Sequence, residues 1–438
     1  MKRTPNSYTE KNFDGHRGNR SDEKKHFAKR HDGRPQHVHH DSDEPELSFQ
    51  ADNTKQWGTA NRPQQYTAIC QRGLENVLAD ELSALGANVT DAARSTVFFT
   101  GDNYTLYKAN MALRSAVNIL RPLKRIIAHD YDMLYFQAKK INWHKMFGID
   151  KTIRIDVKGS SEELTHSQYV IHRIKDAILD TQRKFNDGQR PSVDKDNPDI
   201  HVVAYLTNRD VTLYLDSSGT PLFKRGYRED THFAAPLKEE LAAGLLELSG
   251  WDGKTDVLDI CCGSGTLLIE AALLATHTPP NLHRRFSFQN WSDFDEAAYK
   301  RAKSDLQKQI IPSDIKLTGY EIDKFTAKKA TEIIRSLKLD KMITIINDDF
   351  RHCQHKYENA IIITNPPYGQ RLESDDEEKV FALYKDIGDF LKHNCATSMA
   401  YIFTGNFEAM KHIGLRTSRR IEVWNGPIEG RLLEIKCY

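Results

Sequence analysis

The chain has an unusual strand end at residues 364–372, where the run AIII at 360–363 is followed by TNPPYGQRL. A short apolar run of this kind predicts a strand that is buried on both faces. Pro366 and Pro367 cannot donate a backbone hydrogen bond to a sheet, and Pro366 keeps Asn365 out of helical backbone geometry. The sequence therefore predicts a strand that ends abruptly and presents a rigid tip.

Such a tip suits methyl transfer to a planar exocyclic amine, whose nitrogen lone pair is delocalised into its ring. The side-chain oxygen of Asn365 and the carbonyl of Pro366 can accept the two N–H groups and aim the lone pair. Tyr368 can stack on a flipped base. Because positioning does most of the work, no strong base is required. The predicted catalytic residues are Asn365, Pro366, Pro367 and Tyr368.

A second motif, VLDICCGSGTLLIEAA, reads as a strand, a glycine loop and a helix. Gly263 and Gly265 allow a ligand to approach the backbone at the start of the helix. The spacing differs from the G-x-G-x-x-G loop of dinucleotide folds, and the loop lacks the lysine of a P-loop. Asp259 at the strand tip favours a cationic, amine-bearing ligand. S-adenosylmethionine (SAM) is such a ligand, and we expect it to be the cofactor.

Acidic residues follow the next two strands in order. Glu321 in GYEID can accept hydrogen bonds from ribose hydroxyls, and Asp349 in NDDF can accept one from an adenine amine while Phe350 covers the ring. A single acid at a strand end is usually an ordinary loop residue. Acidic residues at three successive strand ends, in this order, indicate a binding site. The predicted cofactor-binding residues are Asp259, Cys261, Gly263, Gly265, Thr266, Glu321, Asp323, Asp349 and Phe350. The two cysteines of the loop are expected to pack rather than attack, since direct transfer needs no covalent intermediate.

The chain from about residue 236 alternates short apolar strands with helical stretches, as in DVLDIC, KLTGYE, ITIIND, AIIIT and SMAYIFTG. This alternation predicts an α/β fold with a doubly wound parallel sheet. The final segment, IEVWNGPIEGRLLEIKCY, predicts an antiparallel pair of strands at the sheet edge.

The preceding half predicts α+β units. YTAIC begins a β-α-β-β-α order in which YTLYKANMALRSAVNIL is expected to be a helix that ends near Pro122. TIRIDVKGS alternates like a half-buried strand, and YVIHRIKDAILDTQRKF is an amphipathic helix. The segment 200–220 predicts a hairpin that turns at Asn208 to Asp210.

Composition limits the remaining possibilities. Residues 1–62 are polar and rich in His, Lys, Arg and Asp, which predicts a disordered tail whose basic residues could help to hold RNA. No apolar run reaches membrane-spanning length, and no signal peptide is visible. The six cysteines lack metal or disulfide spacing, so we expect a reduced cytoplasmic setting without a metal. Since the net charge is only +1, RNA binding would require local basic patches. The candidates for phosphate contacts are Lys158, Lys224, Arg225 and Arg228.

DICCGSGT and NPPYG resemble the Rossmann-like, SAM-dependent amino-methyltransferases. Together with RGYR, APLKEELAAGLL and NGPIE, they resemble the THUMP-containing 23S rRNA guanine-N2 methyltransferases of the RlmL type. This resemblance covers about residues 65–438. It implies a ferredoxin-like subdomain at 65–128, a THUMP RNA-binding domain at 129–220 and a Rossmann-like methyltransferase domain at 221–438. It also implies 23S rRNA, or a large-subunit assembly intermediate, as the partner.

Two departures from the family pattern are visible. Ile260 stands where the family has proline, and Gly430 where it has cysteine. The chain also ends after RLLEIKCY, so we expect no second methyltransferase activity of the kind that some members carry.

Alternatives remain open. A THUMP-type tRNA guanine-N2 methyltransferase would share both halves. A DNA adenine methylase would need a target-recognition domain, and only about 70 residues follow Tyr368. A non-catalytic ribosome-assembly protein would not be expected to retain the intact motif.

Overall fold

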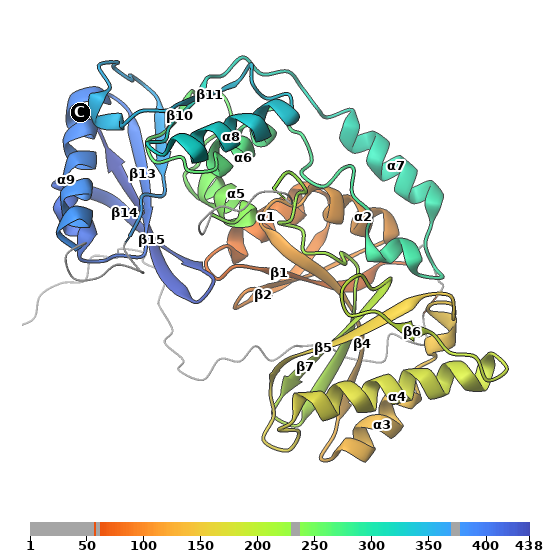
Figure 1. The fold of residues 1–438 in the computed structure, drawn as a ribbon. Coiled ribbons are helices and arrows are strands. Elements are labelled where there is room, and N and C mark those ends of the chain that lie inside the picture. The colour runs from red at the N-terminus through yellow and green to blue at the C-terminus, as the bar shows by residue number, and fades with distance from the viewer. Residues whose placement is uncertain (1–56, 58–61, 229–236, 369–376) are drawn as a thin grey trace, which may run out of the picture. The chain divides into compact units, whose positions relative to one another are not determined.

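The computed structural model describes residue 57 and residues 62–228, 237–368 and 377–438. In this part of the chain the strands form two sheets, one of eight strands and one of seven (Figure 1). The tail predicted for residues 1–62 lies almost entirely outside the described residues.

The first sheet comes from the N-terminal half and has the strand order β2-β3-β1-β4-β8-β7-β5-β6. Its elements are β1 (Gln64–Cys70), α1 (Glu75–Ala84), β2 (Asn88–Ala93), β3 (Thr96–Gly101), α2 (Asn103–Ala112), β4 (Ala116–Ile127), α3 (Tyr131–Lys139), η2 (Trp143–Lys145), β5 (Thr152–Ser160), α4 (Ser167–Phe185), β6 (Ser192–Val193), β7 (Ile200–Thr207) and β8 (Asp210–Asp216).

The two α+β units expected from the sequence share this one sheet, because β4 pairs with β1 on one side and with β8 on the other. Leu120 of β4 is the partner of both Thr67 and Asp216. The hairpin expected near residue 208 is confirmed as β7–β8, and Asn208 adopts a positive φ of 51° at its turn.

The helix expected to run to Pro122 is wrong in its second half. It ends at Ala112, and residues 116–127 form β4. The carboxylate of Glu81 in α1 accepts the backbone N–H groups of Arg114 (2.8 Å) and Ser115 (3.0 Å), which fixes the chain as it leaves the helix. Pro122 is tolerated inside β4 because the pairing with β8 shifts register between Pro122 and Lys124.

The second sheet has the order β11-β10-β9-β12-β13-β15-β14. The elements of the C-terminal half, from which this sheet is built, are α5 (Glu239–Leu248), β9 (Val257–Asp259), α6 (Thr266–Ala275), η3 (Ser287–Asn290), α7 (Glu296–Gln307), β10 (Leu317–Tyr320), α8 (Lys324–Ser336), β11 (Ile343–Ile346), η4 (Phe350–His352), β12 (Ile361–Thr364), α9 (Glu377–Asn394), β13 (Met399–Thr404), η6 (Ala409–Ile413), β14 (Thr417–Asn425) and β15 (Ile428–Lys436). β9 to β13 pair in parallel and β14–β15 is antiparallel, which confirms the predicted doubly wound sheet and its terminal pair.

Both faces of this sheet are covered, which is why its strands are short continuous apolar runs. Val257 and Ile363 pack into the core that contains α6 and α8 residues, while Leu258 and Ile362 pack into the core that contains α9 residues. Figure 1 shows α6 and α8 on the opposite side of this sheet from α9. Every strand tip of the parallel part therefore opens at the same carboxyl edge.

Candidate active site

The tips of β10, β9 and β12 lie side by side at the carboxyl edge of the second sheet. Val257 of β9 pairs with Leu317 of β10 and with Ile361 of β12. The loop after β9 and the NPPY segment after β12 therefore emerge next to each other. This is the crevice where ligands bind in open parallel sheets.

The glycine loop after β9 has the geometry expected of a ligand cradle. Gly263 and Gly265 have φ of +52° and +74°, and α6 begins at Thr266. A side chain built at Gly263 would meet no heavy atom within 4 Å, so the space beside this backbone is open. The N–H of Gly263 donates to Glu321 Oε2 at 3.0 Å and links the first two strand tips. The Glu321 carboxylate can accept hydrogen bonds from ligand hydroxyls, and the open loop backbone can contact a polar group of the same ligand.

Asp259 links β9 to the strand that carries the NPPY segment. Its Oδ1 accepts the hydroxyl of Thr364 (2.7 Å) and the N–H of Cys261 (3.1 Å), and the residue is only 1% exposed. Burial raises the pKa of Asp259 to about 7, and the nearby carboxylate of Glu321 adds to this rise. A cation placed beside Asp259 would be strongly favoured, since it would restore the charged form.

The other predicted cofactor acids already have partners within the chain. Asp323 caps α8 by accepting the N–H of Thr326 at 2.7 Å. Asp349 accepts the N–H and the guanidinium of Arg351, which holds the pKa of this carboxyl below its usual range. Phe350 is 4% exposed and packs edge-on against Phe390, with ring centroids 5.5 Å apart. Asp349 and Phe350 are therefore fixed in place at the third strand tip.

The thiols of the loop are poor nucleophiles. Cys262 is buried and Cys261 is partly exposed, and burial raises the pKa of both thiols. A thiol with a raised pKa carries little thiolate near neutral pH.

Asn365, directly after β12, has an unsatisfied acceptor. Its Oδ1 is buried and has no hydrogen-bond partner among the described residues. Pro366 behind it is buried, while Pro367 is exposed and Tyr368 is half-buried. Leaving a buried carbonyl unpaired costs about 1–3 kcal/mol, so such groups are rare unless a ligand completes them. The oxygen predicted to accept an amine N–H therefore has no competing donor among the described residues.

Tyr368 is held by residues to which sequence reasoning gave no role. Asn425 Nδ2 donates to the Tyr368 hydroxyl at 3.0 Å, and Asn406 Nδ2 donates to its carbonyl at 3.2 Å. A Cβ on Gly405 would lie 3.4 Å from the Tyr368 ring. Asn425 opens the NGPIE motif and Asn406 follows the β13 strand. Asn425 is the last residue of β14 and Asn406 lies two residues after β13, so a position at a strand end was the only signal in the sequence.

Two of the predicted RNA-contact residues are corrected by the structure. The side chain of Arg225 is 1% exposed, pairs with Glu270 at 3.4 Å and donates to the carbonyls of Leu222 and Arg114, each at 2.6 Å. Arg228 is 12% exposed and pairs with Glu239 at 2.6 Å. The RGYR motif therefore packs against the methyltransferase domain instead of presenting both guanidiniums to solvent.

Arg228 also contacts the glycine loop after β9. Its Nη1 donates to Thr266 Oγ1 (3.2 Å) and approaches Ser264 Oγ (3.4 Å). Thr266, predicted as a cofactor residue, is thus part of a network that supports the start of α6. Lys158 and Lys224 are exposed, as predicted for phosphate contacts.

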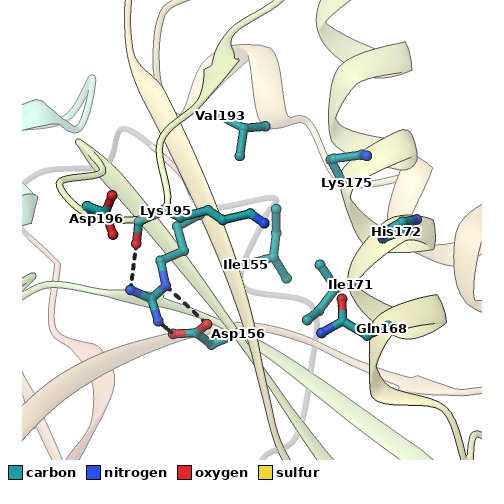
Figure 2. Close-up of a pocket in the computed structure, with 10 residues that line it drawn as sticks. Ile155, Asp156, Gln168, Ile171, His172, Lys175, Val193, Lys195 and Asp196 are labelled. Atoms are coloured by element: carbon teal, nitrogen blue, oxygen red, sulfur yellow. Dashed lines mark hydrogen bonds and ion pairs between the residues drawn. The ribbon is translucent and has the colours of Figure 1, made fainter.

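A second candidate site is a basic pocket of about 570 Å³ on the first sheet (Figure 2). Strand β5 contributes Arg154, Ile155 and Asp156, helix α4 lies opposite, and the segment after β6 closes the rim. The remaining lining residues are Gln168, Ile171, His172, Lys175, Val193, Lys195 and Asp196.

The lysines of this pocket are available for an anion. Arg154 is neutralised by Asp156 at 2.9 Å and donates to the Lys195 carbonyl at 2.8 Å. By contrast, neither Lys175 nor Lys195 has an ion pair with any described residue. Figure 2 shows the Lys195 side chain extending toward Ile155, with Lys175 on the facing helix. Lys158 lies on β5 in the same alternation as Arg154 and Asp156, so it extends this basic face.

None of the helices in the described ranges combines the length and the apolar character that crossing a membrane requires. In the same ranges, His, Cys, Asp and Glu side chains do not gather in groups of three or more that could hold a metal ion.

Three family models match consecutive parts of the chain. Residues 65–120 match the RlmL ferredoxin-like domain, residues 128–216 the THUMP domain, and residues 225–434 the RMKL-like methyltransferase domain. A protein of Synechocystis sp. (strain ATCC 27184 / PCC 6803 / Kazusa), "Putative RNA methyltransferase slr0064", is 34% identical over 391 residues. The match covers 88% of this chain and 100% of that protein.

Solved structures agree with these matches. A possible methylase from Clostridium difficile 630 is 28% identical, with a TM-score of 0.78 over 86% of this chain and 99% of its own. The methyltransferase SMU.472, crystallised with S-adenosylhomocysteine (SAH), is 25% identical, with a TM-score of 0.78 over 86% of this chain and 99% of its own. The chain belongs to the family that joins an RlmL-type ferredoxin-like domain and a THUMP domain to an RMKL-like methyltransferase domain, and its cofactor is SAM.

Proposed function

We propose that this protein is a SAM-dependent RNA methyltransferase that methylates the exocyclic N2 amine of a guanosine in 23S rRNA. The observation that carries the proposal is the buried, unpartnered Oδ1 of Asn365 at the tip of β12, which no described residue satisfies. A planar amine with two N–H groups is the ligand that such an acceptor lacks. The RNA class follows from the THUMP match and from the relative named as an RNA methyltransferase.

The chain's residues would hold the cofactor at the three neighbouring strand tips. When bound, SAM supplies an electrophilic methyl group. Gly263 and Gly265 give its polar part access to the backbone, and Glu321 accepts its ribose hydroxyls. Asp259 favours its positive charge, while Asp349 and Phe350 border its adenine.

The NPPY segment would orient the guanine. Asn365 Oδ1 and the Pro366 carbonyl accept the two amine hydrogens, which turns the nitrogen lone pair toward the methyl donor. Pro367 keeps the segment rigid, and Tyr368 stacks on the base. The described geometry offers positioning and hydrogen-bond acceptance, which is sufficient for in-line transfer.

RNA would be held by the N-terminal half. The basic pocket with the half-buried Lys175 and the exposed Lys195, together with the exposed Lys158 and Lys224, offers cations for phosphates. Such contacts give affinity and register without reading sequence. In this proposal the chain divides into a ferredoxin-like subdomain (65–128), a THUMP domain (129–220) and a methyltransferase domain (221–438). A role in rRNA processing and ribosome biogenesis, in the cytoplasm, follows from this substrate.

The experiment is methyl transfer from labelled SAM to separate pools of unmodified 23S rRNA, large-subunit assembly particles, tRNA and duplex DNA. The product nucleoside is then identified. N2-methylguanosine formed in 23S rRNA or in the particles alone supports the proposal. N2-methylguanosine in tRNA would move the protein to the tRNA-modifying group, and N6-methyladenine in DNA would overturn the RNA assignment. Absence of label from every pool, with SAM binding intact, would favour a non-catalytic role.

A further inference from the structure

A loop of the N-terminal half packs against the β14–β15 hairpin. The backbone N–H of Trp424 donates to the Arg72 carbonyl at 3.0 Å. The Arg72 guanidinium lies over the Trp424 ring, 3.7 Å from its centroid. Gly73 has φ of +93°, and a Cβ there would lie 2.4 Å from the Glu422 carbonyl oxygen. The loop therefore contacts the hairpin backbone so closely that only glycine fits.

The same loop is anchored from behind by helix α5. Gln71 Nε2 donates to Glu240 Oε1 at 3.0 Å, and Glu240 is fully buried. A Cβ on Gly244 would lie 2.6 Å from the Leu74 side chain, so α5 and this loop are in close contact. The loop at residues 71–74 is thus fixed on two sides, which makes it a rigid support for the hairpin.

The supported hairpin reaches the catalytic motif at its turn. Trp424 is followed directly by Asn425, whose Nδ2 donates to the Tyr368 hydroxyl at 3.0 Å. Ile428, on the other arm of the turn, lies with the Tyr368 ring beside Gly405. A continuous set of contacts therefore runs from Arg72 through Trp424 and Asn425 to Tyr368.

We propose that Asn425 is a positioning residue that sets the ring of Tyr368 for stacking on the target base, and that Arg72 supports it through Trp424. This inference rests on the proposed function, because it assigns Tyr368 to the base. Among the described contacts, no residue of the NPPY segment itself hydrogen-bonds to the hydroxyl of the half-buried Tyr368. Its orientation therefore depends on a donor from another part of the sheet.

The physical consequence is on the chemical step. A tyrosine ring that tilts displaces the amine relative to the methyl donor, and a displacement of about 1 Å can cost about 10²-fold in rate. The proposed cofactor contacts and the proposed phosphate contacts of the N-terminal half lie elsewhere, so the affinities for SAM and for RNA as a whole should stay nearly the same. Removal of the Asn425 hydrogen bond should therefore lower kcat and leave KM for RNA and Kd for SAM nearly unchanged.

The test is a double-mutant cycle with Asn425→Ala and Tyr368→Phe. We expect each single variant to lower kcat about tenfold, within the range that misplacement can cause. The double variant should be no slower than either single variant, because both remove the same hydrogen bond. Multiplicative losses, or an effect confined to Kd for SAM, would overturn the proposal.

Arg72→Ala tests the support, and Arg420→Ala is its matched control. Arg420 is an exposed arginine on the same β14 strand whose guanidinium donates to Thr417 within that strand. Removal of a cation–π contact at a partly exposed site should lower kcat by about threefold. If Arg72→Ala and Arg420→Ala have equal kcat, the role assigned to Arg72 is wrong.

A second readout separates this inference from the proposed function. The same cycle is measured by urea unfolding of the substrate-free protein. We expect the unfolding equilibrium constant of the double variant to differ by at least about threefold from the product of the two single effects of Asn425→Ala and Tyr368→Phe, as for residues in contact. If no RNA is methylated by the parent, the proposed function fails. Additive unfolding effects would show that the Asn425–Tyr368 contact does not hold the ring, and would overturn the inference whether or not RNA is methylated.

Discussion

Asn365 combines a functional need with an energetic cost at a single atom. Its buried Oδ1 lacks a partner among the described residues, which disfavours the folded state by about 1–3 kcal/mol. Conflicts of this kind are expected where a site must stay ready for a ligand.

Substitution Asn365→Ala should therefore separate activity from stability. We expect methyl transfer to fall by about 10²-fold or more, as when an oriented hydrogen-bond partner of the reacting group is removed. The free energy of unfolding should not decrease, and SAM affinity should be retained. Activity assays and urea unfolding check this. Methyl transfer at the parental rate would contradict the mechanism, and a large drop in stability would show that Asn365 is structural.

Asp259 makes the stability of the free protein depend on pH. Its pKa is raised from 3.8 to about 7 when folded, so the folded state holds a proton that the unfolded state has released between these values. The sign follows directly: stability falls as pH rises from about 4 to 7, by roughly 1.4 kcal/mol for each pH unit at most.

Asp259→Asn should remove this dependence, because an amide of the same shape can still accept from Thr364. We expect the variant to be more stable than the parent at pH 8, and the difference to shrink toward pH 4. SAM binding should weaken, since the variant has no carboxylate to attract the cation. Unfolding series at several pH values measure the difference. Parallel stability curves for parent and variant would contradict the raised pKa.

At the scale of elements, the RGYR segment between the two sheets has a structural role. Arg225 pairs with the fully buried Glu270 of α6 and donates to carbonyls on both sides of the junction. Removing one partner of a buried ion pair typically costs about 3–5 kcal/mol of stability, because the other charge stays buried without compensation.

Arg225→Ala should therefore destabilise the protein by roughly 3 kcal/mol or more, and leave the RNA affinity of the folded protein unchanged. The neighbouring Lys224→Ala is the matched control, because Lys224 is exposed. It should change stability by less than about 0.5 kcal/mol and should weaken RNA binding. Thermal unfolding and RNA binding at low temperature give both numbers. Equal stabilities of the two variants would refute the role assigned to Arg225.

At the scale of the whole molecule, the proposed sites of methyl transfer and of RNA contact fall on different sheets. The second sheet carries the proposed methyl-transfer site, whereas the first carries the basic pocket, whose two lysines form no ion pair with a described residue. Affinity for RNA should accordingly depend on salt through the first sheet.

The double substitution of Lys175→Ala and Lys195→Ala should weaken RNA binding similarly for different sequences. It should also reduce the slope of log affinity against log salt by about 2, roughly one for each phosphate that a lysine no longer neutralises. Lys254→Ala with Lys300→Ala is the control, since both lysines are exposed and paired with acids on the methyltransferase domain. Binding isotherms at several salt concentrations check this. An unchanged slope would place the RNA elsewhere.

The sequence by itself determined the parallel sheet and the order of its chemical tips. Short apolar strands, a glycine loop and the Asn-Pro-Pro-Tyr end are local patterns. Each can be recognised from residues that are close together in the sequence. For the same reason the β7–β8 hairpin and the β14–β15 pair could be predicted from turn residues alone.

Only the tertiary structure decided which charges are exposed and which segments pair. Residues 116–127 became a strand because β1 and β8 offered hydrogen-bonding edges and Glu81 ended the helix, although the sequence predicted a helix as far as about Pro122. Arg225 was withdrawn from the surface by Glu270, and Asn425 was brought to Tyr368, by contacts between residues far apart in sequence. Burial and long-range pairing depend on the whole fold, so no local pattern could have shown them.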